Sequence, residues 1–175
     1  MEDQPKLSAK SIMLNYGLML GFISIIIALV NYVFGNIYEP HWILMVVSFL
    51  TTIAVIVLGV KKLKELNGGF LSLGQAIKIG LGIALISALI YAAYLAIFIN
   101  YIEPAYFENV AAVQEQKIIE GYPNLTDEQL EGAIKNAAMF NNTGANVTMA
   151  IMFSLIFGLI VSLITGLIMK RSEED

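Results

Sequence analysis

Four long apolar runs limit what this chain can fold into. Lys78, in the third run, is the one charged residue that they contain. A membrane-spanning α-helix needs about 20 mainly apolar residues, and buried helices of soluble proteins are seldom so long and so free of charge. The sequence therefore predicts an all-α membrane protein with four transmembrane helices. The predicted spans cover about residues 12–34, 42–60, 73–99 and 147–169.

The composition supports this class and limits the chemistry. Hydrophobic residues make up 58% of the chain and charged residues 14%, whereas soluble domains carry about 25% charged residues. The chain has no cysteine and one histidine, which excludes disulfides, thiolate metal sites and clusters of histidine ligands. It has no phosphate-binding glycine loop and no basic face interleaved with aromatic residues. We expect a single integral membrane domain over residues 1–175, without a catalytic residue, metal, cofactor or nucleic-acid partner.

Lysine and arginine predict the orientation, because short cytoplasmic loops carry an excess of these residues. If the spans alternate in direction, one side holds eight of the ten basic residues and the other holds Lys117 and Lys135. We therefore expect both termini in the cytoplasm. The eight residues are Lys6, Lys10, Lys61, Lys62, Lys64, Lys78, Lys170 and Arg171.

The segment between spans three and four, residues 100–146, is long and acidic. Pro104 suits the first position of a helix that would end near Gly121. Thr126 followed by Gln129 is a capping box that would open a second helix, to about Phe140. We expect a short helical extracytoplasmic cap. A mobile acidic loop is the alternative.

Small residues recur every four positions in spans three and four. Helices in lipid associate closely where small residues let their backbones approach, so we expect these two spans to pack together. The sequence leaves open whether the contact lies within one chain or between chains. The small residues are Gly80, Ala84, Ala88 and Ala92 in span three, Ser154, Gly158, Ser162 and Gly166 in span four, and Gly17 and Gly21 in span one.

The charged residue in span three lies near the start of its helix. Ser72 followed by Gln75 is a capping box, so the helix should begin near Leu73 and Lys78 can extend to the headgroups. Lys78 is also a candidate ligand of a lipid phosphate, together with Lys61, Lys62 and Lys64.

Uncharged polar residues also occur inside the spans. We expect interhelical hydrogen bonds from these side chains, and a ligand path is the alternative. They are Asn15 and Asn31 in span one and Thr51 and Thr52 in span two.

A Glu-Pro pair follows span one and another follows span three. Glu39-Pro40 lies in "FGNIYEPHW" and Glu103-Pro104 in "FINYIEPAY", and other residues match at the same offset of 64. The echo suggests two tandem helical hairpins related by an axis along the membrane normal. Proline disfavours helix in the preceding residue and suits the start of the next helix, so both pairs predict an outer-surface turn. A cation site shared by the two glutamates is a minor alternative.

A third group of motifs resembles a known family. "NGGFLSLGQAIKIG", residues 67–80, and "NYIEP", residues 100–104, are similar to the bacterial family called domain of unknown function 4199. The resemblance covers almost the whole chain. It implies a small four-span protein of the bacterial inner membrane, of a kind common in Bacteroidota, and it transfers no catalytic residue.

Three functions fit these features. The first is a non-enzymatic membrane subunit or scaffold, as a homo-oligomer or with another membrane protein, because the spans carry no charge at mid-membrane. The second is a small transporter or channel-like protein acting as an oligomer, although proton-coupled transport would call for an intramembrane carboxylate. The third is an accessory to a membrane enzyme that handles lipid-linked substrates.

Overall fold

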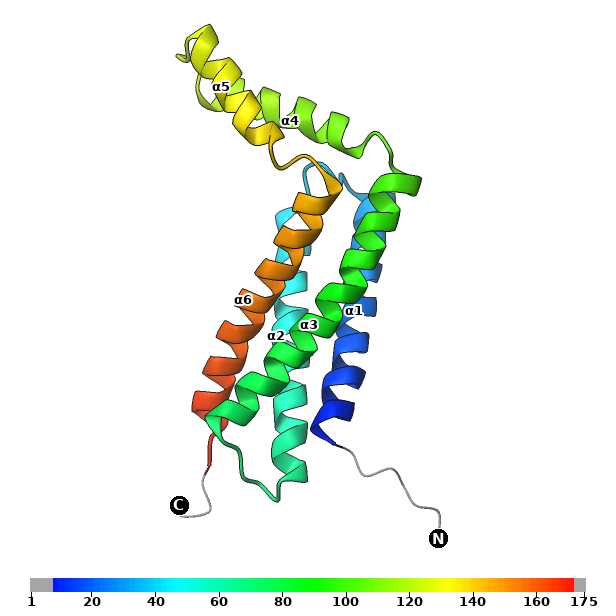
Figure 1. Cartoon of the computed structure of the whole chain (residues 1–175), viewed down its shortest axis with the longest axis vertical. Coiled ribbons are helices and arrows are strands. Elements are labelled where there is room, and N and C mark those ends of the chain that lie inside the picture. The colour runs from blue at the N-terminus through cyan, green and yellow to red at the C-terminus, as the bar shows by residue number, and fades with distance from the viewer. Residues whose placement is uncertain (1–7, 172–175) are drawn as a thin grey trace.

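Six α-helices make up the protein, seen in a computed structural model that describes residues 8–171 (Figure 1). A π-helical turn, η1 (Phe98–Ile102), continues α3, and these residues contain no strand. Lys6 lies outside the described range. The helices are α1 (Ala9–Phe34), α2 (Trp42–Leu66), α3 (Leu73–Ile97), α4 (Tyr106–Gly121), α5 (Asp127–Ala138) and α6 (Thr143–Met169).

Four of these helices are long and apolar enough to cross a membrane: α1, α2, α6 and α3 extended by η1. This confirms the predicted all-α membrane protein with four transmembrane helices. The central helix is α3, which packs against α1, α2 and α6, while α2 also contacts α1 and α6. The start of α1, the end of α6 and the α2–α3 turn lie at one end of the bundle, which we call the terminal end (Figure 1).

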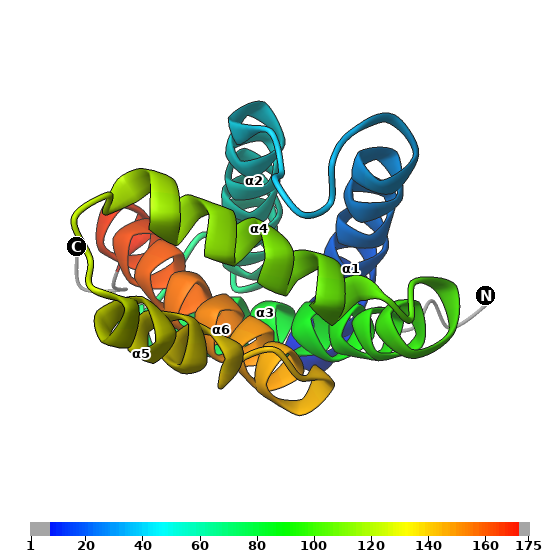
Figure 2. The ribbon, with the colours of Figure 1, turned by 90° about the horizontal axis from the view of Figure 1, so that it is seen from above.

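Helices α4 and α5 lie across the opposite end, the platform end (Figure 1). Seen from above, α4 passes over the space between α1 and α2 on one side and α3 and α6 on the other (Figure 2). We call residues 106–138 the platform. Its two helices pack against each other, and neither has a buried residue.

Local signals explain several helix ends. The capping boxes predicted at Ser72 and Thr126 are both present. The α2 helix runs six residues beyond the predicted end of span two, so the basic cluster after that span is helical. It stops at a turn where Gly68 and Gly69 have φ values of 67° and 96°, a conformation that costs glycine little. Leu71 then exchanges two backbone hydrogen bonds with Arg171, of 3.1 and 3.0 Å.

The prolines of the two Glu-Pro pairs do not begin helices, and this part of the prediction was wrong. Helix α2 begins at Trp42 and α4 at Tyr106, in each case two residues after the proline. In the first turn, His41 is extended and its Nδ1 accepts the Ile43 N–H at 3.3 Å, so the helix starts after it. In the second, the Tyr106 N–H donates to the Glu103 carbonyl at 2.9 Å and closes a turn around the proline.

The buried core lies toward the terminal end. Its residues come from early α1, late α2, early α3 and late α6, which meet there because neighbouring helices alternate in direction. The two ends of the bundle therefore differ, with dense packing at the terminal end and more open packing below the platform. The largest fully buried side chains are Ile12, Ile56, Val60, Leu71, Ile79, Ile83 and Ser162.

Candidate functional site

The α3–α6 contact is a row of small residues within one chain. A Cβ atom added to Gly158 would lie 2.5 Å from Ala84 Cβ, and one added to Gly166 would lie 2.8 Å from Ala76 Cβ. Gly80 faces Ser162 too closely to accept any side chain. Because these residues are small, the backbones of the two helices approach closely, and the resulting van der Waals packing favours helix association in lipid. Ser154 adds one interhelical hydrogen bond, donated to the Ala84 carbonyl at 3.2 Å.

The glycines of α1 face isoleucines of α3. A Cβ on Gly17 would lie 2.7 Å from Ile86 Cβ, and one on Gly21 would lie 2.9 Å from Ile90 Cδ1. Ala88 and Ala92 are also buried on α3. The predicted small residues thus serve two faces of α3, one toward α6 and one toward α1.

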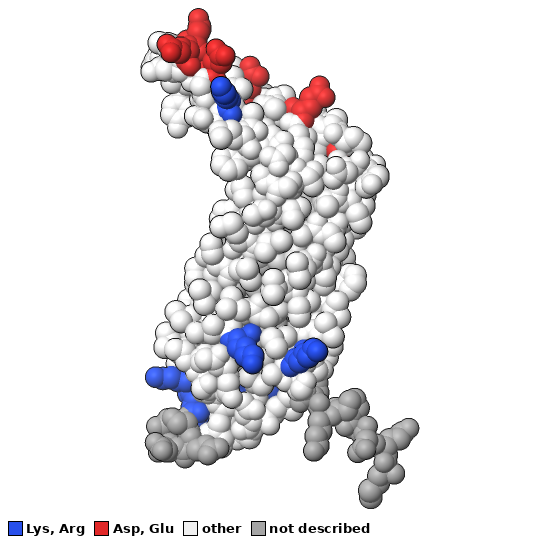
Figure 3. Space-filling model, in the orientation of Figure 1, with Lys and Arg blue, Asp and Glu red and all other residues white. Residues whose placement is uncertain are grey.

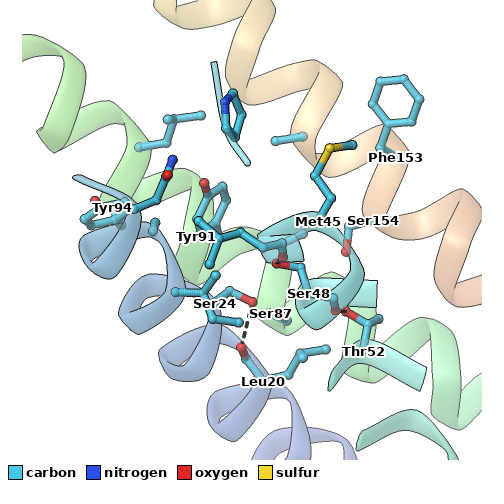
Figure 4. A pocket seen from close by; sticks show the side chains of 18 of the residues that line it. Leu20, Ser24, Met45, Ser48, Thr52, Ser87, Tyr91, Tyr94, Phe153 and Ser154 are labelled. Carbon is cyan, nitrogen blue, oxygen red and sulfur yellow. Dashed lines mark hydrogen bonds between the residues drawn. The ribbon is translucent and has the colours of Figure 1, made fainter. Parts of the chain in front are cut away.

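Below the platform the four long helices enclose a cavity of about 530 Å³ (Figure 4). Pro40 and Tyr106 line it at the platform end, and Leu20 lines it toward the core. Ile37 of the α1–α2 loop and Phe98 of η1 also contribute, the rest of the lining comes from α1, α2, α3 and α6, and no lining residue is charged. Its volume falls within the range of small-molecule sites.

Hydroxyl groups line this cavity. Figure 4 shows Ser24, Ser48, Thr52 and Ser87 turned toward the same space from α1, α2 and α3. Three of these hydroxyls donate to backbone carbonyls four residues earlier in their own helices: Ser24 to Leu20 at 2.9 Å, Ser48 to Leu44 at 2.8 Å and Thr52 to Ser48 at 2.9 Å. The expected interhelical bond from Thr52 is therefore an intrahelical one.

Asn31 also lines the cavity, and its Oδ1 is buried without a hydrogen-bond partner. Asn31 and Thr52 stood out in the sequence as polar residues within spans, but the serines and Tyr91 did not. Serine is common in membrane helices and carries no sequence signal for a cavity. The position of each serine along its helix, compared with the polar positions of the other spans, is the sequence feature that could have indicated the cavity.

Two of the four lysines predicted as lipid-phosphate ligands have partners within the protein. Lys78 lines a second cavity, of about 590 Å³, between the start of α1 and the end of α2. Lys62 pairs with Glu65 at 3.3 Å. Lys64 donates to the Met169 carbonyl at 2.9 Å and so joins α2 to the end of α6. Lys61 is exposed on α2.

The two Glu-Pro turns contact each other. The Tyr38 hydroxyl donates to Glu103 Oε1 at 3.0 Å and accepts from Asn109 Nδ2 at 2.9 Å. The rings of Tyr38 and Tyr106 lie 5.9 Å apart. Partial burial raises the pKa of Tyr38, the Asn109 hydrogen bond lowers it, and the Glu103 carboxylate raises it.

Both glutamates of the echo already have partners. Glu39 Oε1 lies 3.0 Å from Lys117 Nζ of α4, and Glu103 accepts from Tyr38. Residues 8–171 contain no group of three or more side chains placed to hold a metal ion. The turns therefore join the α1–α2 loop to α4.

A further link holds the platform at its other side. Gln114 of α4 and Asn141, which precedes α6, exchange amide hydrogen bonds of 3.4 and 3.0 Å. The platform thus has links to both the α1–α2 loop and the start of α6. Acidic side chains gather over it, whereas lysine and arginine gather at the terminal end, with an uncharged belt between them (Figure 3). Glu108, Glu115, Glu120, Asp127, Glu128 and Glu131 are all exposed.

Comparison with known proteins identifies a family but no characterised relative. No curated protein and no solved structure matches the chain significantly. The sequence does match, over residues 15–171, the family described as protein of unknown function (DUF4199). That match covers most of α1 and all of α2, α3, α6 and the platform, and the chain therefore belongs to this family.

Proposed function

We propose that this protein is a non-enzymatic subunit of the bacterial inner membrane, and that its platform docks a partner protein on the extracytoplasmic side. The observation that carries the proposal is an acidic two-helix layer that is linked to the bundle but buries none of its own residues. Isolated helices of 16 and 12 residues are marginal in water, so such a layer gains stability from a surface that covers it.

Charge indicates the chemistry of the partner. Segment 100–146 carries seven carboxylates against Lys117 and Lys135. A second copy of this chain would present the same acidic surface and be repelled. We therefore expect a different protein with a basic extracytoplasmic surface. The α5 helix begins with Asp127 and Glu128, where carboxylates also stabilise the helix N-terminus.

Orientation follows from the same charge separation. The basic terminal end would face the cytoplasm, because lysine and arginine are retained on that side, and the platform would then face outward. The non-enzymatic assignment is supported by the main cavity, whose lining includes no carboxylate, imidazole or thiol. Its serine and threonine hydroxyls therefore have no adjacent general base of these kinds to activate them as nucleophiles.

Photo-crosslinking from the platform tests the proposal. A photoreactive residue at Asn136, exposed on α5, should give a discrete adduct with a lysine- and arginine-rich segment of one other protein. Combining Glu120→Gln, Glu128→Gln and Glu131→Gln should lower its yield about tenfold, because each exposed ion pair contributes roughly 0.2–1 kcal/mol. High salt should also lower the yield of the adduct, because it screens the interaction between exposed charges.

Two controls sharpen this experiment. Glu65→Gln removes an exposed carboxylate from the terminal end and should leave the yield unchanged. A photoreactive residue at Ile168, which is 78% exposed on the apolar surface of α6, should not give that adduct. An adduct that is insensitive to the triple change, or that maps to a segment without basic residues, would contradict the proposal.

A further inference from the structure

The cavity below the platform has properties of a binding site, and the argument for it is independent of the platform's partner. It lies at membrane depth, because most of its lining comes from α1, α2, α3 and α6. The buried core lies toward the terminal end, so this cavity occupies the half of the bundle below the platform.

The lining restricts the charge of an occupant. It contains no aspartate, glutamate, lysine, arginine or histidine. An ionised carboxylate or phosphate placed there would lose its hydration without gaining a counter-charge, a penalty of several kcal/mol. The occupant is therefore uncharged within the cavity.

Hydrogen bonding restricts it further. The hydroxyls of Ser24, Ser48 and Thr52 already donate to backbone carbonyls, so their remaining capacity is to accept. Asn31 also lines the cavity, but its Oδ1 is covered by protein and lies beside Gly35. A hydroxyl of the occupant can donate to the three accepting oxygens, which an ester or a ketone cannot do. It can also accept from the hydroxyls of Ser87 and Tyr91, which line the same cavity.

One side of the cavity is open to lipid. Among its lining residues Met45, Phe49 and Phe153 are 52%, 48% and 65% exposed. They belong to α2 and α6, which contact each other, and Figure 4 shows Met45 and Phe153 at the edge of the cavity. An apolar tail can pass between these helices into the bilayer while the head remains inside.

From these observations we infer that the cavity binds an uncharged amphiphile with a hydroxyl-bearing head and an apolar tail. The hydroxyls of Ser24, Ser48 and Thr52 accept hydrogen bonds from the head. The aromatic residues of α3 and α6, among them Tyr91 and Phe157, pack against its apolar part.

Three probes with the same oleoyl chain separate the requirement for a hydrogen-bond donor from the requirement for an uncharged head. 1-Oleoylglycerol is uncharged and donates from its hydroxyls, methyl oleate is uncharged and cannot donate, and oleate is charged. The protein is held in nanodiscs of phosphatidylethanolamine and phosphatidylglycerol, and its melting temperature is followed against probe concentration. We expect 1-oleoylglycerol to stabilise the protein, methyl oleate to bind about three- to tenfold more weakly, since one hydrogen bond is lost, and oleate to have no specific effect.

Matched variants locate the effect. Ser48→Phe fills the cavity from α2, and Val47→Phe adds the same ring on its lipid-exposed side. The first should abolish stabilisation by 1-oleoylglycerol and the second should retain it. Ser24→Ala removes one accepting oxygen from the cavity. It should weaken the binding of 1-oleoylglycerol about three- to tenfold and leave the binding of methyl oleate unchanged.

Two results would overturn the inference. One is equal stabilisation by all three probes, because that describes general partitioning into the bilayer. The other is equal binding by the Ser48→Phe and Val47→Phe variants, because the ligand would then lie outside the cavity. Neither result bears on the crosslinks of the platform, so the two proposals fail separately.

Discussion

We expect Gly158→Leu to lower the apparent melting temperature of the detergent-solubilised protein by about 5–10 °C, because overpacking a well-packed contact costs about 1–3 kcal/mol or more. A Cβ atom at this position already falls 2.5 Å from Ala84 Cβ. A leucine therefore forces α6 away from α3. The loss extends along the row, because Gly80 with Ser162 and Gly166 with Ala76 depend on the same separation. Ala88→Leu should act in the same direction, since Ala88 is 5% exposed on α3.

The same substitution in α5 provides the control. A Cβ atom added to Gly132 would meet no other atom within 4 Å, and leucine is a better helix former than glycine. Gly132→Leu should leave the melting temperature unchanged or raise it slightly. Equal melting of wild type and Gly158→Leu would show that the α3–α6 contact does not stabilise the fold.

The second large effect is expected at the link between the platform and the bundle. Tyr38→Phe removes a hydroxyl that both donates to Glu103 and accepts from Asn109. Leaving two polar groups without partners costs about 1–3 kcal/mol, which raises the ratio of detached to attached platform about five- to hundredfold. Spin labels on Gly132→Cys and Leu66→Cys, introduced into this cysteine-free chain, should report a broader distance distribution in electron–electron double resonance.

The pH dependence of this link has a definite sign. The pKa of Tyr38 is raised, so the stability that its neutral phenol contributes is fully present below the unfolded value of about 10. That contribution is lost as the pH rises through the higher folded pKa. The narrow distribution of the wild type should persist at neutral pH and broaden above about pH 10. Tyr122→Phe, which alters an exposed tyrosine, should behave as wild type, and an unbroadened Tyr38→Phe variant would contradict the role of Tyr38.

Patterns of short range made much of the fold predictable. Long uncharged runs indicated four membrane helices, and Ser72 with Gln75 and Thr126 with Gln129 marked where α3 and α5 begin. These features depend on residues within one turn of each other, so the sequence displays them directly. Span two was expected to begin at about residue 42, where α2 does begin. The expectation that proline itself begins each helix was wrong, because His41 and the Glu103 carbonyl fix the two turns.

The contacts between segments could be predicted only in part. Small residues at a period of four indicated a close contact of spans three and four. The contact of the α1 glycines with Ile86 and Ile90 could not be predicted, because it depends on which face of α3 each helix meets. The link through Tyr38 could not be foreseen, because its partners lie 65 and 71 residues away. The tandem-hairpin origin of the Glu-Pro echo stays a prediction.

The cavity was the least predictable feature. It arises where the helices diverge below the platform, and no single residue of the sequence predicts that divergence. Its hydroxyls look like the ordinary serines and threonines of membrane helices, satisfied within their own helices. The informative feature is that hydroxyls from three helices face the same space, which appears only once the helices are placed.

The side of the membrane on which the platform lies is the central claim, because a docking surface for an extracytoplasmic partner must face outward. Single cysteines at Gly132 in α5 and at Leu66 near the terminal end can be tested in spheroplasts with a membrane-impermeant maleimide. Leu66 is 41% exposed, and a Cβ at Gly132 meets no neighbour, so both positions can react. The account predicts that Gly132→Cys is labelled in intact spheroplasts and Leu66→Cys only after permeabilisation. The reverse pattern would place the platform in the cytoplasm and contradict it.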